Sequence, residues 1–220
     1  MNQSNKGEIM PDQFTSPPLR ISNIVHGRRN NSGRVEYLLD SRGGENPKFE
    51  IPEQIVLKRW GARSHTKYKF GGMRLSPNIW RSIRLSVGAD YSEISSLSSE
   101  DINQRNRDCS AALKLKKYKS VNGGNVLKLF EGLGLSKFQS LMTRHNDPVR
   151  SDIYGTPDLF LWALCKASFK VQYIRFVEVK KPREPLSEDQ KNELHYLNFD
   201  LNIKARVLRL REAKSGTIAE

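Results

Sequence analysis

Two apolar segments of the chain carry ionisable side chains at positions where a buried strand normally has none. Residues 155–162 read GTPDLFLW, with Asp158 between a proline and four apolar residues. Residues 176–190 read FVEVKKPREPLSEDQ, with Glu178 between two valines and Lys180 two positions later. Charged residues are almost never fully buried unless they are paired or bind a metal. These two segments therefore constrain the fold and the function together.

Alternation along these segments predicts where the charged groups lie. We predict strands over residues 156–164 and 171–180, joined by a polar turn. Residues two apart in a strand share one face, so Glu178 and Lys180 project to the same side. Asp158 begins the neighbouring strand. If the two strands form a hairpin, the three ionisable groups meet at one edge of a sheet.

The rest of the second half predicts two further strands and two helices. Residues 125–133 have the apolar spacing of a helix that Gly134 can end. A strand can follow over residues 137–144. Residues 187–199 predict a second helix, and residues 203–210 a last strand. The order helix, three strands, helix, strand predicts an α/β fold with a mixed central sheet flanked by helices.

The first half of the chain has weaker signals. We expect a flexible tail over residues 1–20 and a β-hairpin within residues 33–60. Residues 61–90 interleave aromatic and basic side chains, which suits base stacking, although a small β-rich module is the simpler interpretation. We therefore divide the remainder into a basic, β-rich module of unknown type over residues 21–100, a candidate for docking DNA, and a domain over residues 101–214.

The charge of the chain favours a polyanionic partner. Its formal net charge is +13 and its pI about 9.8, a balance typical of nucleic-acid-binding proteins. A basic protein with a solvated surface is the alternative. No run approaches the roughly 18 apolar residues of a membrane span, and the N-terminus lacks the apolar core of a signal peptide. We expect no membrane partner and a cytoplasmic location, or a nuclear one in a eukaryote.

Two carboxylates that converge on one point suit a hard divalent cation. Mg²⁺ prefers oxygen ligands and typically uses one or two carboxylates plus substrate phosphate, and the carbonyl of Val179 could add a ligand. Such a cation polarises a phosphoryl oxygen, and Lys180 could orient water and offset negative charge. A solvated ion pair explains Glu178 and Lys180 alone. Together with Asp158, however, the set suits phosphodiester hydrolysis.

These motifs resemble the VRR-Nuc domain, a branch of the PD-(D/E)XK nuclease superfamily, and especially the nuclease domain of the Fanconi-associated nucleases. The resemblance rests on the G-x-P-D-L strand, the V-E-V-K strand and an L-S-x-x-Q after a proline, and covers about residues 125–210. It implies a restriction-endonuclease-like core and Mg²⁺ as cofactor, with Mn²⁺ as a substitute. It also implies Asp158 and Glu178 as metal ligands and Lys180 as the catalytic lysine.

The resemblance extends to a glutamine and, less clearly, to a glutamate. Gln190 matches the family's glutamine and is expected near the active site, although Ser187 and Gln190 also form the pattern of a helix capping box. The family usually has a glutamate on its first core helix, but Glu131 lies near the C-terminal end of the predicted helix. Glu131 is our first candidate for this metal ligand and Glu100 the second. If neither contributes, a one-metal site is expected.

Basic residues near the motifs are candidates for binding the nucleic acid. The segment TRHNDPVR lies just before the first motif, and its Arg144, His145 and Arg150 could grip phosphates that flank the scissile bond. Lys181, next to the catalytic lysine, is a further candidate. An acid–base role for His145 is the alternative.

Together these features predict a magnesium-dependent deoxyribonuclease that is selective for flap, branched or junction DNA, with DNA repair as one setting. The alternatives are a catalytically inactive DNA-binding module on a nuclease scaffold and a restriction-type endonuclease. The sequence has no glycine-rich phosphate-binding loop, which argues against an ATPase. Nucleases that cut both strands often act as dimers, so a homodimer is an open expectation.

Overall fold

Two sheets are present in the computed structural model, which describes residues 24–29, 35–39, 49–88, 90–113, 121–147, 155–181 and 183–210. The smaller sheet is antiparallel and consists of β1 (Ile24–Arg29), β2 (Val35–Leu39) and β3 (Phe49–Glu50). The pairing of β2 with β3 confirms a hairpin within residues 33–60.

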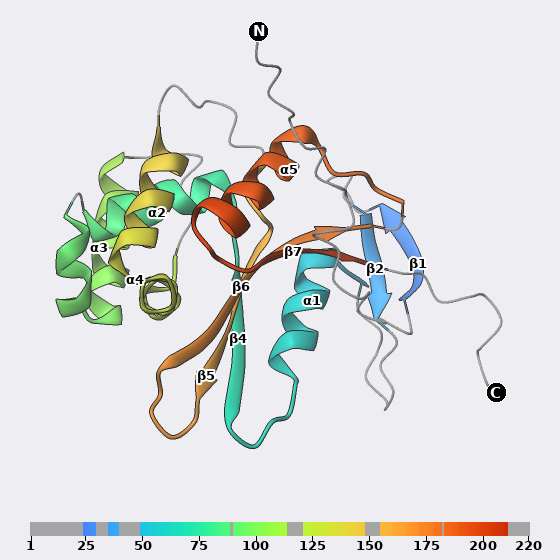
Figure 1. The fold of residues 1–220 in the computed structure, drawn as a ribbon, viewed down its shortest axis with the longest axis horizontal. Helices are drawn as coiled ribbons and strands as arrows, with labels where there is room; N and C mark the ends of the chain where they lie inside the picture. The colour runs from blue at the N-terminus through green and yellow to red at the C-terminus, as the bar shows by residue number, and fades with distance from the viewer. Residues whose placement is uncertain are drawn as a thin grey trace, which may run out of the picture.

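The larger sheet is mixed and positions the candidate site. Its order is β4 (Tyr68–Arg74), β5 (Leu159–Cys165), β6 (Val171–Lys180) and β7 (Ala205–Arg209). The first three strands are antiparallel neighbours, whereas β6 and β7 are parallel. This sheet and the helices around it confirm the predicted α/β class (Figure 1).

One predicted strand is wrong. Residues 137–144 belong to α4 (Gly123–Asn146), which is kinked at Gly134 with a φ of 71°. Glycine adopts this left-handed conformation readily, so it does end the first helical segment, but a second helical segment follows it. Phe138, Leu141 and Met142 are buried, and their spacing is that of one helix face.

The strand that completes the antiparallel part of the sheet is β4, which precedes α4 in the sequence. β4 pairs with β5 over its full length, from Tyr68 opposite Cys165 to Arg74 opposite Leu159. It lies in residues 21–100, so this region and residues 101–214 share one sheet. The predicted boundary at residue 100 falls inside α3 (Ser99–Leu113).

A helix also replaces part of the strand-like run predicted before residue 60. α1 (Pro52–Gly61) begins with a proline, which is well tolerated in the first turn because the N–H it lacks would have no helical partner there. Its Ile55 and Val56 are buried against the sheet. The region is thus less β-rich than predicted.

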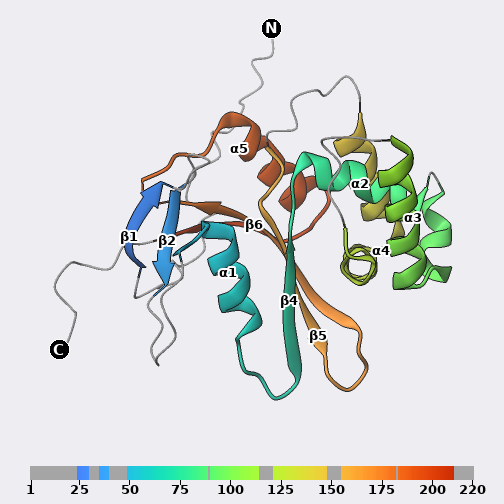
Figure 2. The ribbon, with the colours of Figure 1, turned by 180° about the vertical axis from the view of Figure 1, so that it is seen from behind.

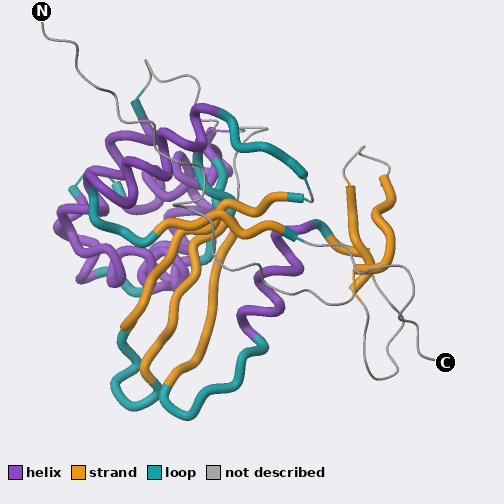
Figure 3. The backbone as a smooth tube through the Cα atoms, turned by 45° about the vertical axis from the view of Figure 1, so that its right-hand side comes forward, coloured by secondary structure: helices purple, strands orange, loops and turns teal. Residues whose placement is uncertain are grey.

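The two faces of the larger sheet are covered by different helices. Phe160, Trp162 and Phe176 pack in one core with α2 (Pro77–Val87), η2 (Tyr91–Ser96), α3 and α4, and with α5 (Glu188–His195) and η4 (Tyr196–Asp200). Leu161 and Val177 face the opposite way and pack with α1. Figures 1 and 2 show α1 and the other helices on opposite sides of the sheet. In Figure 3 the ends of β4, β5 and β6 project beyond the helical layer.

Membrane spans were expected to be absent from the sequence. Across the described ranges, each helix is too short or too polar to cross a bilayer.

Candidate active site

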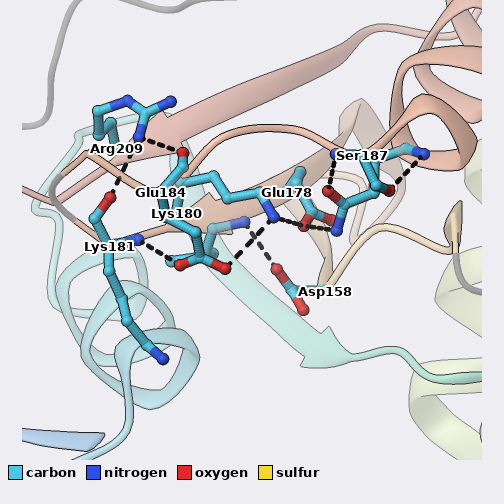
Figure 4. Close-up of polar contacts among 9 residues, drawn as sticks. Asp158, Glu178, Lys180, Lys181, Glu184, Ser187 and Arg209 are labelled. Carbon is cyan, nitrogen blue, oxygen red and sulfur yellow. Dashed lines mark hydrogen bonds and ion pairs between the residues drawn. The ribbon is translucent and has the colours of Figure 1, made fainter.

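The carboxylate of Asp158 lies where the pairing between β5 and β6 ends. The last paired residues of these strands are Leu159 and Val177. Beyond them, Oδ2 of Asp158 accepts a hydrogen bond of 2.7 Å from the backbone N–H of Val179 (Figure 4). The carbonyl of Asp158 accepts a second bond, of 2.7 Å, from the N–H of Leu75. Asp158 is therefore fixed through both its main chain and its side chain.

Glu178 and Lys180 lie beside Asp158 on β6, so the predicted convergence of the three groups is present. Nζ of Lys180 is 3.2 Å from Oε1 of Glu178, and both side chains are buried. The same oxygen accepts a hydrogen bond of 2.6 Å from the side-chain amide of Gln190. Lys180 also lies 3.5 Å from Oε1 of Glu184, which is more exposed. These groups form one connected network (Figure 4).

The surroundings of the two carboxyl groups raise their pKa values. Burial raises the pKa of Asp158 to about 6, the hydrogen bond from Val179 opposes this shift, and the nearby charge of Glu53 adds to it. Burial, followed by the charge of Asp158, raises the pKa of Glu178 to about 8, although Lys180 counteracts both. Burial is the main cause of both shifts, and the charge of Lys180 offsets it only in part. Such shifts are typical of functional sites.

The residues present fit a divalent cation. Oε2 of Glu178 is buried and has no hydrogen-bond partner among the described residues, which is costly for a charged oxygen. In a strand the N–H and C=O of one residue point to the same side, so the carbonyl of Val179 faces the side of Asp158. Carboxylate and carbonyl oxygens are the ligands that Mg²⁺ prefers.

The cation would be held by few protein ligands. Within the part of the chain that the structure describes, no three His, Cys, Asp or Glu side chains form a ready metal-binding group. The expected ligands are therefore Asp158, Glu178 and the carbonyl of Val179. Mg²⁺ commonly keeps several waters and takes the remaining oxygens from substrate phosphate, so this set is sufficient.

Glu53 is the nearby carboxylate that the sequence interpretation missed. It lies in the first turn of α1, is partly buried, and raises the pKa of Asp158 through its charge. It was overlooked because its segment was predicted as a strand. Proline at the first helical position, followed by an acidic residue, is a helix-start signal that could have identified α1.

The two glutamates proposed for the helix position are elsewhere. Glu131 forms an ion pair of 3.1 Å with Lys128 and accepts a hydrogen bond of 3.0 Å from the N–H of Val171. Val171 begins the ten-residue strand β6, about 25–30 Å from its other end at about 3.3 Å per residue. Glu100 is exposed on α3 and pairs with Arg107. Neither residue joins the site.

Arg144 and His145, predicted to contact phosphates, bind a buried carboxylate instead. Glu193 on α5 lies 2.8 Å from Nε of Arg144 and 3.2 Å from Nε2 of His145. His145 is 3% exposed and stacks on Trp80, and Arg144 lies over the ring of Tyr196. Burial opposes ionisation of Glu193, but its two basic partners outweigh burial and lower its pKa.

The other two predicted nucleic-acid contacts have different positions. Arg150 lies outside the described residues. Lys181 is half-buried, and its side chain points away from the carboxylates while its backbone N–H donates to Glu184 (Figure 4). Lys181 is thus next to the site without being part of its network.

The cluster around Glu193 fastens α5 beside the site. Gln190 and Glu193 are three positions apart, which places them on neighbouring turns of one helix face. Gly155, at the start of the GTPD segment, allows close approach to α5, because a Cβ there would lie 2.4 Å from the carbonyl oxygen of Asp189. The ion pairs of Glu193 and the close approach at Gly155 together hold α5 so that Gln190 lies close to Glu178.

Comparisons with known proteins identify a domain family. The sequence profile of the VRR-NUC domain matches residues 98–212. A search of curated proteins gives no significant match.

Two similar solved structures are crystal structures of paFAN1 bound to DNA that has a gap and a 5′ flap. The complex with a 2-nucleotide flap has 14% sequence identity and a TM-score of 0.47, and the match covers 73% of this chain and 34% of that chain. The complex with a 1-nucleotide flap has 16% sequence identity and a TM-score of 0.40, and the match covers 77% of this chain and 36% of that chain. This chain therefore spans about a third of the length of either relative.

The VRR-NUC match takes in β5, β6 and α5, and so includes Asp158, Glu178, Lys180 and Gln190. It also covers more than half of the 220 residues. The chain therefore belongs to the VRR-NUC domain family.

Proposed function

We propose that the protein is a metal-dependent nuclease that hydrolyses phosphodiester bonds in DNA. Membership of the VRR-NUC family supports a DNA nuclease. The observation that carries the proposal is the unpartnered, buried Oε2 of Glu178 beside Asp158 and Lys180. A buried acceptor of this kind suits a cation, and a cation bridging protein and phosphate oxygens suits phosphoryl chemistry.

The proposed cofactor is Mg²⁺, with Mn²⁺ as a substitute, held by Asp158, Glu178 and the carbonyl of Val179. When bound, such a cation supplies Lewis-acid polarisation of a phosphoryl oxygen. Gln190 donates to Oε1 of Glu178 and thereby leaves Oε2 available as a ligand. Glu53 would add negative charge that strengthens cation binding, since its field already acts on Asp158.

Lys180 is the proposed catalytic lysine. It is buried and held within 3.5 Å of the carboxylates of Glu178 and Glu184, so its ammonium group is positioned before substrate binds. A preorganised cation costs little reorganisation when negative charge develops on a phosphate. The N–H groups of Lys180 would orient the attacking water and stabilise that charge.

The proposed substrates are flap, branched or junction DNA, and restriction-type cutting of linear duplex is the alternative. The net charge of +13 supports a polyanionic substrate. The test is cleavage of a labelled panel that contains linear duplex, single strand, 5′ and 3′ flaps and a four-way junction. Each substrate is incubated with Mg²⁺, Mn²⁺ or a chelator.

Lys180→Ala tests the site within this panel, and Lys191→Ala is its control. Lys191 is also on a VRR-NUC element, but it forms an exposed ion pair with Glu188. We expect cation-dependent cutting that Lys180→Ala reduces at least about a hundredfold and Lys191→Ala leaves unchanged. DNA binding without cutting under any cation would instead identify an inactive DNA-binding module.

A further inference from the structure

The end of the sheet farthest from the active site has a row of aromatic rings on the face that α1 packs against. We call it the aromatic end, and it consists of Trp60, His65, Tyr68, Phe70 and Tyr173. Neighbouring ring centroids are 4.9 Å apart for Trp60 and Phe70, 4.9 Å for His65 and Tyr68, and 5.4 Å for Tyr68 and Tyr173. Trp60 is fixed by hydrogen bonds of 3.0 Å from its indole N–H to two backbone carbonyls.

Strand alternation places this row on the face opposite the helical core. Ile174 packs in the core on the helical side, where Gly132 of α4 leaves room for it. Tyr173, one position earlier, points to the opposite face, and 60% of its surface is exposed. α1 covers this face near Leu161 and Val177 but ends at Gly61, before the strands end (Figure 3). His65 and Tyr173 are therefore exposed, whereas Trp60, Tyr68 and Phe70 are half-buried behind them.

The two segments that carry most of the aromatic end have charged residues of one sign. Residues 61–70 and 163–175 contain no aspartate or glutamate. Their basic residues are Arg63, Lys67, Lys69, Lys166, Lys170 and Arg175. All of these except Arg175 are exposed, and Arg63 lies over the rings of Trp60 and Phe70. The surface thus complements an anionic ligand that also has flat, apolar groups.

We propose that the aromatic end binds a single-stranded segment of DNA by stacking bases on its rings. Proteins that bind single strands combine basic grooves for the backbone with aromatic side chains for the bases. Duplex DNA offers phosphates but keeps its bases stacked on one another, so it would leave the exposed ring of Tyr173 unused. The inference rests on the proposed function in that this strand belongs to the nuclease's substrate.

A single strand of DNA that occupies the active site can also reach the aromatic end. Tyr173 and Glu178 are five residues apart on β6, about 17 Å at about 3.3 Å per residue, and their side chains lie on opposite faces of the strand, so this distance is a minimum. α1 spans the same interval on the face of the aromatic end, with Glu53 in its first turn and Trp60 in its last. For a strand that keeps the stacked rise of about 3.4 Å per nucleotide, this separation corresponds to about five nucleotides.

The first test is binding, measured by fluorescence anisotropy with a labelled oligothymidine about ten nucleotides long. A chelator is present, so the result does not depend on cleavage. We expect Tyr173→Ala to weaken binding at least about fivefold, and Tyr173→Phe to bind like the wild type because it keeps the ring. Phe199→Ala is the control, since Phe199 is a similarly exposed aromatic residue, 57% exposed, on η4.

The second test is cleavage of substrates whose single-stranded arm is varied in length. We expect Tyr173→Ala to slow cleavage only when the arm exceeds about five nucleotides. If Tyr173→Ala binds and cuts like the wild type, the inference is overturned and the proposed function stands. If no substrate is cut with any cation but the binding series behaves as expected, the proposed function fails and the single-strand site stands.

Discussion

The side-chain amide of Gln190 donates a hydrogen bond of 2.6 Å to Oε1 of Glu178. The other end of the same side chain, Oε1 of Gln190, accepts a bond of 3.0 Å from the N–H of Ser187. Ser187 reciprocates by capping the N–H of Gln190, so the two residues form a complete capping box. One glutamine therefore fixes both the start of α5 and the orientation of the carboxylate.

This double contact predicts that Gln190 and Ser187 can be separated by mutation. Ser187→Ala should cost about 1 kcal/mol of unfolding free energy through the lost cap and should leave cleavage largely intact. Gln190→Ala should lose similar stability and, in addition, reduce cleavage about tenfold or more, because Oε1 of Glu178 loses a charge-assisted hydrogen bond. Urea unfolding and single-turnover cleavage measure the two effects. Equal loss of cleavage in both variants would contradict a direct role for Gln190.

The position of Glu53 predicts an effect on cation binding that Glu131 does not share. Glu53→Gln removes a charge that acts on Asp158, so the apparent affinity for Mg²⁺ in cleavage should fall several-fold. Glu131→Gln is the matched change at the far end of β6 and should leave this affinity unchanged. Titration of activity with Mg²⁺ distinguishes them. A larger effect at Glu131 would show that Glu131, and not Glu53, acts on the cation.

The raised pKa values of Asp158 and Glu178 predict how stability depends on pH without a metal. Each group is easier to protonate in the folded state than in the unfolded state, so its contribution is present at low pH and is lost as pH rises through about 6 and about 8. Glu178→Gln resembles the protonated acid at every pH. In chelator, its stability relative to the wild type should rise between about pH 4.5 and about pH 8 and stay constant above that.

Denaturant unfolding at several pH values measures this difference, and Mg²⁺ provides the control. A ligand that binds only the folded state stabilises it. At high pH, Mg²⁺ should therefore raise the unfolding free energy of the wild type more than that of Glu178→Gln. A stability difference that does not vary with pH would contradict the shifted pKa of Glu178.

The ion pairs of Glu193 predict a structural effect rather than a loss of DNA contacts. Glu193→Gln leaves the partly buried Arg144 without its anionic partner and should cost about 3–5 kcal/mol. Glu188→Gln, on the exposed side of the same helix, should leave stability nearly unchanged. Urea unfolding provides the comparison, and similar stabilities would show that the buried pairs contribute little.

The sequence was sufficient to predict the centre of the site because its parts are local. The segments around Asp158 and Glu178 form adjacent strands, and strand alternation alone places Glu178 and Lys180 on one face. Gln190 follows on the next helix, where it both completes the capping box and lies beside Glu178. None of these inferences required a contact between distant parts of the chain.

Other features depended on distant contacts that the sequence does not display. β4 reads YKFGGMR, and glycines weaken a strand prediction. The structure shows why they are tolerated: a Cβ at Gly71 would lie 2.7 Å from the Trp162 ring, and one at Gly72 would lie 2.6 Å from Leu161. Similarly, Arg144 resembled a phosphate ligand until Glu193, 49 positions later, was seen to pair with it.

The pairing of β4 with β5 has a consequence for how the chain folds. Helices α2, α3 and α4 lie between these neighbouring strands in the sequence. The polypeptide must close this long loop before the two strands can pair, and contacts of large sequence separation slow folding. A fragment limited to residues 98–212 would lack β4 and leave an edge of β5 with unpaired N–H and C=O groups. Such an apolar edge, LFLWALC, invites pairing with other chains. β4 replaces it with an edge that carries Lys69 and Arg74, and charged edge strands disfavour self-association.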